Sequence, residues 1–209
     1  MLLSDPTPLI KVPVIPVVTI ERAADAVPLA RALLAGGLNV IEITLRTPAA
    51  LDAARAIIAE VPEILVGIGT VLRPLDVTHA IDAGADFLVS PGTPTSLVQA
   101  LADAPVPALP GCATVSEAMS LAAFGFPVLK FFPAESSGGL HWLKAVVEPL
   151  PEIRFVPTGG VNGDNAPSYL ALGNVLAVGG SWVAPAEAIA AGDFAGITAR
   201  ARIAAALRP

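Results

Sequence analysis

The stretch VLKFFPAE, residues 128–135, decides how the rest of the chain is interpreted. It is a short apolar run with Gly125 and Pro127 before it and Pro133 within it, which is typical of a strand buried on both faces. Lys130 stands in the middle of this run, although lysine is rarely fully buried. Desolvation favours the neutral amine, the form that attacks a ketone to give a Schiff base. A lysine that reaches solvent or pairs with a buried acid fits the stretch equally.

The composition indicates a globular protein with an extensive apolar interior. Hydrophobic residues make up 54% of the 209 residues and charged residues 14%. The longest uncharged run, 165–186, contains Pro167, Gly173 and the pair Gly179-Gly180, so it does not predict a membrane-spanning helix. A parallel sheet buried on both faces explains the apolar content better. We therefore expect no membrane partner.

The net charge and the cysteine content limit which partners and which cellular compartment the sequence favours. The net charge of −6 argues against a general nucleic-acid binder. The single cysteine, Cys112, excludes an internal disulfide and suits a reducing compartment, and no secretory signal pattern opens the chain. We therefore expect a cytoplasmic protein that does not bind nucleic acid.

Eight apolar runs recur along the chain with helical patterns between them. They are spaced 19 to 26 residues apart and begin near Val14, Val40, Ile64, Phe87, Val106, Val128, Ile153 and Val175. Each interval fits one strand and one helix, so the pattern predicts a single (β/α)₈ TIM barrel, of class α/β, that spans residues 1–209 as one domain. A doubly wound open sheet is the structural alternative, but no Gly-x-Gly-x-x-Gly follows a strand.

Helix signals between the runs support this prediction. Gly36-Gly37 is expected to end a helix over residues 26–34. Thr47-Pro48 predicts an N-cap and first-turn proline for a helix that includes residues 51–61. Thr114 and Glu117 form a capping-box pattern before residues 118–124. The patterns in residues 185–190 and 194–207 predict the last two helices of the chain.

Polar residues cluster where strands of such a barrel end, which is where barrel enzymes carry their chemistry. In the run 39–46, period-two alternation places Glu42, Thr44 and Arg46 on one face. A carboxylate and a guanidinium would then lie at the barrel mouth. An internal ion pair between Glu42 and Arg46 that only stabilises the strand is the alternative.

Small, tight turns follow several of the runs. Gly67-Ile68-Gly69-Thr70, Ser90-Pro91-Gly92 and Pro110-Gly111 would let a ligand approach the backbone, although each is also ordinary turn chemistry. The turns Thr158-Gly159-Gly160 and Gly179-Gly180-Ser181 follow the seventh and eighth runs. TIM barrels often bind phosphate at these two positions. We therefore expect a phosphate site there.

The remaining reactive side chains do not suggest a metal site. His79 and His141 are isolated and are expected on the surfaces of helices, and with Cys112 they make no zinc spacing. Cys112 reads as a small core residue. We expect neither a metal nor another cofactor.

In their order along the chain, these motifs resemble the family of 2-keto-3-deoxy-6-phosphogluconate (KDPG) aldolases, which also includes 4-hydroxy-2-oxoglutarate (KHG) aldolases. The resemblance covers the chain from about residue 14 and rests on seven segments: 41–47 with Gly36-Gly37, 67–71, 90–92, 110–111, 129–135, 157–160 and 179–182. One departure is that only about ten residues precede the first strand, where similar proteins often carry a helical extension.

The resemblance implies a metal-independent class I aldolase, usually a homotrimer, whose partners are pyruvate and a phosphorylated 2-keto-3-deoxy sugar acid. It implies that Lys130 forms the Schiff base and that Glu42 is the general acid/base. Further implied positions are the carboxylate ligands Arg46 and Thr70, the pocket residues Pro91 and Thr158, and the phosphate turns with Gly159, Gly160, Gly180 and Ser181.

Three alternatives stay open at this point. The substrate could be the galactonate epimer, which differs from the gluconate compound at one stereocentre. A phosphosugar isomerase or epimerase could use Glu42 as a base without a covalent intermediate. A catalytically silent phosphate-binding barrel would need no buried amine such as Lys130, and the sequence disfavours it.

Overall fold

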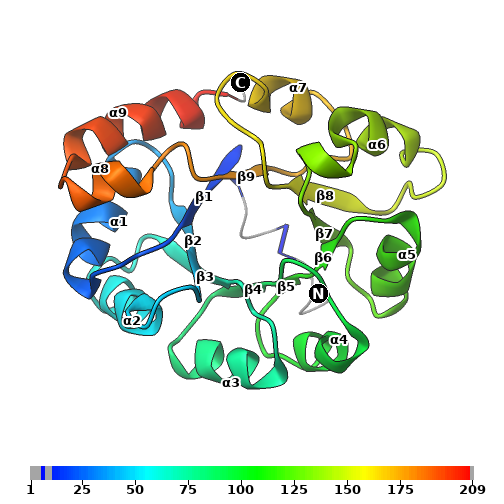
Figure 1. Cartoon of the computed structure of the whole chain (residues 1–209), viewed down its shortest axis with the longest axis horizontal. Coiled ribbons are helices and arrows are strands. Elements are labelled where there is room, and N and C mark those ends of the chain that lie inside the picture. The colour runs from blue at the N-terminus through cyan, green and yellow to red at the C-terminus, as the bar shows by residue number, and fades with distance from the viewer. Residues whose placement is uncertain (1–5, 8–10, 208–209) are drawn as a thin grey trace.

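The computed structural model describes residues 6–7 and 11–207, and over these the chain forms a ring of parallel strands surrounded by helices (Figure 1). The strands are β1 Val14–Val18, β2 Val40–Thr44, β3 Leu65–Gly69, β4 Phe87–Val89, β5 Ala108–Leu109, β6 Gly111–Cys112, β7 Val128–Phe131, β8 Arg154–Pro157 and β9 Val178–Gly180. All strand pairs given by the register are parallel.

The strands follow one another around a barrel. One sheet has the order β5-β4-β3-β2-β1-β9 and the other the order β6-β7-β8. Isolated parallel bridges between Phe155 and Val175 and between Thr158 and Gly179 connect β8 to the chain at β9. On the other side, only Pro110 separates β5 from β6. The predicted TIM barrel is confirmed, and the open doubly wound alternative is not observed.

The fifth strand is split at Pro110, which has no N–H to donate to a ladder. Before it, Leu109 pairs with Val89 on β4, and after it Gly111 pairs with Lys130 on β7, so the strand changes its partner there. The carbonyl of Pro110 still accepts a hydrogen bond from the backbone N–H of Lys130 at 3.0 Å. The predicted start of this strand near Val106 is two residues early, because Pro107 also lacks an N–H.

Helices surround the ring of strands (Figure 1). They are α1 Ala26–Ala35, α2 Ala50–Glu60, α3 Pro74–Asp82, α4 Thr95–Ala102, α5 Val115–Ala123, α6 Gly139–Ala145, α7 Ala166–Leu170, α8 Ala186–Ala190 and α9 Phe194–Ala205, with 3₁₀ turns η1 Ala23–Asp25 and η2 Glu135–Ser137. Among the residues described, none of these helices combines the length and the apolarity that a bilayer crossing needs.

Most predicted helix signals act as expected, with one exception. Gly36 caps α1, and Gly37 follows with a φ of +90°. The capping box of α5 is formed: the Thr114 hydroxyl accepts from the N–H of Glu117, and the Glu117 carboxylate accepts from the N–H of Thr114. The prediction for Thr47 is wrong, because α2 begins at Ala50 and the Thr47 hydroxyl donates to the carbonyl of Ile20. Thr47 therefore ties the end of β2 to the end of β1.

The apolar core lies between the strands and the helices. Ile41 and Ile43 on β2 are fully buried, as are Leu29 and Leu33 on α1. Helices α1 and α9 approach closely at Gly36, where an added Cβ would stand 2.4 Å from the Cβ of Ala201. The burial of both faces of the strands explains the high hydrophobic content.

Candidate active site

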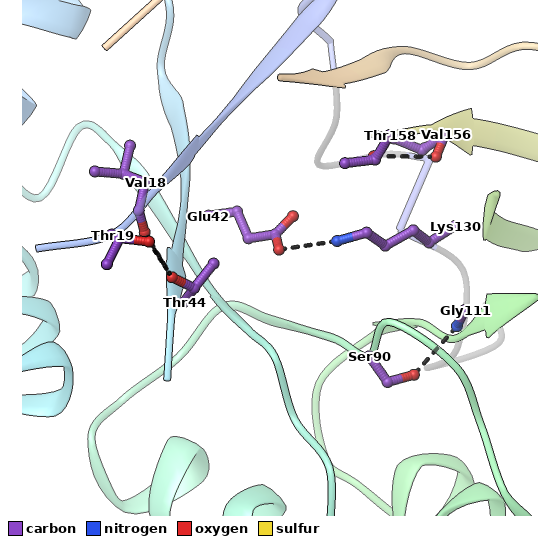
Figure 2. A network of polar contacts seen from close by, with 9 residues as sticks. All are labelled: Val18, Thr19, Glu42, Thr44, Ser90, Gly111, Lys130, Val156 and Thr158. Carbon is purple, nitrogen blue, oxygen red and sulfur yellow. Dashed lines mark hydrogen bonds and ion pairs between the residues drawn. The ribbon is translucent and has the colours of Figure 1, made fainter. Parts of the chain in front are cut away.

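The central feature of the site is a buried pair of opposite charges inside the barrel. Lys130 on β7 donates from Nζ to Oε1 of Glu42 on β2 at 3.1 Å, and the two side chains are 6% and 4% exposed. Figure 2 shows the two side chains reaching toward each other from opposite sides of the barrel. Lys130 does not extend to solvent, which removes one of the two structural explanations for its position. The contact distance allows direct proton transfer between the two groups.

A glycine on the neighbouring strand makes room for the Glu42 carboxylate. Gly69 on β3 is paired with Thr44 on β2, and an added Cβ at Gly69 would lie 2.1 Å from Oε1 of Glu42. No side chain other than hydrogen could occupy this position without moving the carboxylate. The prediction of a tight turn at 67–70 is therefore wrong for Gly67 to Gly69, which lie within β3, and Gly69 is instead a packing requirement of the site.

Arg46 does not pair with Glu42. Its side chain is exposed and lines a cavity at the barrel mouth, and among the described residues its guanidinium makes no salt bridge. The Glu42–Arg46 ion pair that the alternation left open is thus not formed, and Lys130 takes that place. This exposed guanidinium at the mouth is available to an anionic ligand.

The cavity has a volume of about 560 Å³ and collects most of the predicted binding residues. Arg46, Thr158, Gly159, Gly160, Gly180 and Ser181 line it, together with Val17, Thr19, Phe132, Val161, Ala184, Pro185, Ala186 and Glu187. Lys130 and Glu42 do not line it. Their position is adjacent, because the Lys130 Nζ lies 5.4 Å from the centre of the Phe132 ring, which forms part of the wall. The cavity therefore lies beside the charged pair.

The two glycine turns form one end of this cavity. Gly159 and Gly160 have φ values of +93° and +83°, a region that favours glycine. The loop is held by three hydrogen bonds: Ala134 and Glu135 donate their N–H groups to the carbonyls of Thr158 and Gly159 at 2.8 and 3.1 Å, and the Asn165 amide donates to Gly160 at 3.1 Å. The turn is thus fixed to the segment that follows Lys130.

The second turn is fixed by an aromatic ring. An added Cβ at Gly180 would lie 1.6 Å from the ring of Trp182, so the indole packs directly against the backbone of this glycine. Ser181 between them is exposed and lines the cavity. The cavity wall therefore carries a serine hydroxyl beside the glycines of both turns.

Two predicted binding residues lie outside the cavity wall. Thr70 follows β3 with a φ of +59°, which is unusual for a β-branched residue and typical of strain at functional sites. The carbonyl of Pro91 packs against Gly111, where an added Cβ would stand 2.3 Å away. Both follow strands of the same barrel, at the ends that hold the site.

The other reactive side chains are placed as expected. His79 on α3 and His141 on α6 are exposed. Cys112 is buried, and burial followed by the nearby Glu117 raises the pKa of its thiol to about 12, so it stays protonated at neutral pH. Within the described ranges, no three His, Cys, Asp or Glu side chains gather as a metal site would require.

The sequence alone did not single out several residues of this cavity. Thr19, Phe132 and Glu187 line it. The Thr19 hydroxyl lies 3.0 Å from that of Thr44, which donates to the carbonyl of Val18 at 3.0 Å (Figure 2). The available signal for Thr19 was its position, since it is the first polar residue after the apolar run of β1.

Fold and site together define a (β/α)₈-barrel enzyme whose buried lysine and carboxylate face each other near the carboxyl ends of the strands. Comparison with known proteins gives the family. The chain belongs to the KDPG and KHG aldolase family, whose model matches residues 7–200. It is therefore an aldolase, a carbon–carbon lyase, and the resemblance drawn from the motifs is confirmed.

Individual relatives agree with this assignment. The KHG/KDPG aldolase of Escherichia coli K12 is 48% identical over 190 residues, which cover 91% of this chain and 89% of the relative. The KDPG aldolase of Legionella pneumophila, solved with pyruvate captured as a covalent carbinolamine, matches with a TM-score of 0.92 and 43% identity over 94% of this chain and 96% of its own. The enzyme of Zymomonas mobilis ZM4 with 3-phosphoglycerate matches with a TM-score of 0.89 and 46% identity, over 96% and 94%.

Proposed function

We propose that this protein cleaves KDPG into pyruvate and glyceraldehyde 3-phosphate through a Schiff base on Lys130. The observation that carries the proposal is the buried Lys130–Glu42 pair at 3.1 Å, beside a cavity lined by two glycine turns. The relatives named KDPG aldolase support it, as does the covalent pyruvate adduct in the Legionella protein.

The reaction begins with the amine of Lys130. Lys130 passes a proton to Glu42, whose carboxylate lies 3.1 Å from Nζ, and the neutral amine attacks the C2 ketone. A proton moves from the nitrogen to the oxygen to give the carbinolamine, Glu42 returns its proton to the departing hydroxyl, and loss of water leaves the iminium, which is the electron sink for the next step. Glu42, again a carboxylate, then accepts the proton of the C4 hydroxyl. The C3–C4 bond breaks, its electron pair forms the enamine, and C4 leaves as the aldehyde.

The second half of the reaction returns the enzyme to its starting state. Glu42 delivers a proton to the enamine carbon, which becomes the methyl group of pyruvate. Water then hydrolyses the iminium and frees Lys130. One carboxylate thus acts as base and acid in turn, a role that requires it to be close to the lysine and shielded from bulk water.

Binding groups at the two ends of the substrate keep the reacting bond in place. Arg46 and Thr70 hold the C1 carboxylate, which suits the planar fork of a guanidinium. The turns with Gly159, Gly160, Gly180 and Ser181 hold the C6 phosphate, and Thr158 and Pro91 complete the pocket. Fixing both ends lowers the entropic cost of reaching the transition state.

A second substrate is favoured by the names of the relatives. KHG carries the same 2-keto-4-hydroxy unit without a phosphate, and the E. coli relative is named for both compounds. We propose that KHG is cleaved by the same Lys130 and Glu42, with less help from the glycine turns. The galactonate epimer remains the alternative, to be separated by comparing kcat/KM for both epimers.

The assembly and the compartment belong to the same proposal. We propose a homotrimer that acts in the cytoplasm and binds pyruvate and a phosphorylated 2-keto-3-deoxy sugar acid, with no metal or other cofactor. A sedimentation measurement of the purified chain tests the trimer.

Trapping with borohydride tests the Schiff base. Incubation with pyruvate and sodium borohydride should inactivate the protein and add one reduced pyruvyl group to Lys130, as read by peptide mass spectrometry. Lys11 and Lys144 serve as internal controls because both are exposed. Modification of either in place of Lys130, or no modification, contradicts the proposal and would favour an isomerase without a covalent intermediate. EDTA treatment should leave cleavage intact, and a loss restored by a divalent cation would contradict the metal-independent mechanism.

A further inference from the structure

We propose that the Thr19 hydroxyl, oriented by Thr44, binds the substrate hydroxyl that lies between the reacting bond and the phosphate. In KDPG this is the C5 hydroxyl, which becomes the C2 hydroxyl of glyceraldehyde 3-phosphate after cleavage. The inference deepens the proposed function and rests on it. Thr19 would then select substrates by the group at C5, whereas Arg46 and Thr70 bind the C1 carboxylate and the glycine turns bind the C6 phosphate.

The order of the strands puts Thr19 between the two ends of the site. Strand β1 lies between β2, which carries Glu42, and β9, which leads into the second glycine turn. In the register, Val17 faces Glu42 and Pro16 faces Gly180. Thr19 directly follows β1 and lines the cavity. A substrate that extends from Glu42 to Ser181 therefore passes the end of β1.

The hydrogen bonds around Thr19 fix which way its hydroxyl is polarised. Thr44 is fully buried, and its only hydroxyl proton goes to the carbonyl of Val18 at 3.0 Å. The 3.0 Å contact between the two hydroxyls must then be a hydrogen bond from Thr19 to Thr44 (Figure 2). The Thr19 proton is used, and its oxygen keeps lone pairs free for the cavity. Thr19 is therefore an acceptor and recognises a group that donates.

This polarity selects a chemical class of substrate. A sugar-acid hydroxyl donates and fits, whereas a methylene at the same carbon does not use the acceptor. Since Thr19 is half-buried, the gain is that of one neutral hydrogen bond, which amounts to about 3- to 10-fold in kcat/KM.

The test uses the condensation reaction, in which the aldehyde can be varied at one carbon. Pyruvate is combined with D-glyceraldehyde 3-phosphate or with 3-oxopropyl phosphate, which keeps the aldehyde and the phosphate but lacks the hydroxyl. Thr19→Val should lower kcat/KM about 3- to 10-fold for the hydroxylated aldehyde and leave the deoxy aldehyde nearly unchanged. Thr19→Ser should restore the preference. Thr78→Val, a change at an exposed threonine on α3, is the matched control and should alter neither rate.

The outcomes separate the inference from the proposed function. Equal losses on both aldehydes for Thr19→Val, or no loss on either, would overturn the role of Thr19 while the aldolase function stands. A wild-type protein that condenses pyruvate with neither aldehyde overturns both.

Discussion

The substitution Gly69→Ala should slow catalysis by displacing the Glu42 carboxylate while the Schiff-base lysine remains in place. The φ of Gly69 lies outside the left-handed region, so alanine meets no backbone strain there. Its new Cβ would stand 2.1 Å from Oε1 of Glu42 and 2.7 Å from Cδ and Cγ. Ordinary contact distances require the carboxylate to retreat by about 1 Å or more, and a misplacement of this size can cost about 10²-fold in rate.

The assay separates this effect from general damage. We expect kcat for KDPG cleavage to fall about 10²-fold, which corresponds to about 2.7 kcal/mol of activation free energy, while pyruvate and borohydride still modify Lys130. Crowding in a packed core also lowers the free energy of unfolding by about 1–3 kcal/mol, so folding is checked by thermal denaturation. Gly173→Ala is the control, because its Cβ would meet open space. A folded Gly69→Ala protein with wild-type kcat would refute the steric reasoning.

Three further predictions address other groups. Glu42→Gln should still form the borohydride-trapped adduct but lose about 10²- to 10⁴-fold in cleavage and in pyruvate proton exchange; exchange at the wild-type rate would contradict its role as base. Ser181→Ala should lower kcat/KM for KDPG by about 10- to 150-fold and for KHG far less, because only KDPG has the phosphate; equal losses would make Ser181 a support of the loop. Hydrogen bonds from the backbone of Ala113 and then from Thr114 outweigh partial burial and lower the pKa of Glu117. Its stabilisation is therefore present above the unfolded pKa of about 4.3 and lost as pH falls through the lower folded value. Because Glu117 is exposed, Glu117→Ala should lower the free energy of unfolding at pH 7 by only about 0.3–1 kcal/mol, and a cost that persists at pH 2 would contradict this assignment.

Much of the fold could be predicted because its signals are local and repeated. Each apolar run is bounded by glycine, proline or a cap. An error of two residues in where one strand begins does not change the number of strands predicted. The errors fall where a tertiary contact overrides a local preference. Thr47 is a residue type that often caps helix N-termini, but here its hydroxyl donates a hydrogen bond to the carbonyl of Ile20, which is adjacent only in the folded barrel. The sequence pattern predicts a single fifth strand, although the missing N–H of Pro110 could have indicated an interruption there.

The candidate site shows the same division. Lys130 and Glu42 are each conspicuous in sequence, but 88 residues separate them, and alternation along one strand offered Arg46 as the partner of Glu42. Residues four apart on a strand share a face yet lie about 13 Å apart, at about 3.3 Å per residue. The Glu42 carboxylate therefore lies closer to Lys130 on the opposite side of the barrel than to Arg46 at the end of its own strand. Thr19 was missed because a single hydroxyl after a strand carries no pattern, and only the neighbouring Thr44 gives it a direction.

The buried pair itself argues that chemistry, and not stability, accounts for it. Moving two charges out of water costs several kcal/mol for each ion, and replacing a buried pair with apolar residues of similar size is often neutral or stabilising. Lys130 and Glu42 are 6% and 4% exposed. Among the residues that the structure describes, they make one hydrogen bond with each other, and Lys130 lies 5.4 Å from the centre of the Phe132 ring, so no wider hydrogen-bonded network offsets the desolvation. The surrounding core of alanine, valine and isoleucine could fill that space at lower cost. The barrel instead keeps an amine and a carboxylate at 3.1 Å, with Gly69 hollowed out to hold the carboxylate. An arrangement that the fold does not need is best explained by the reaction that does need it.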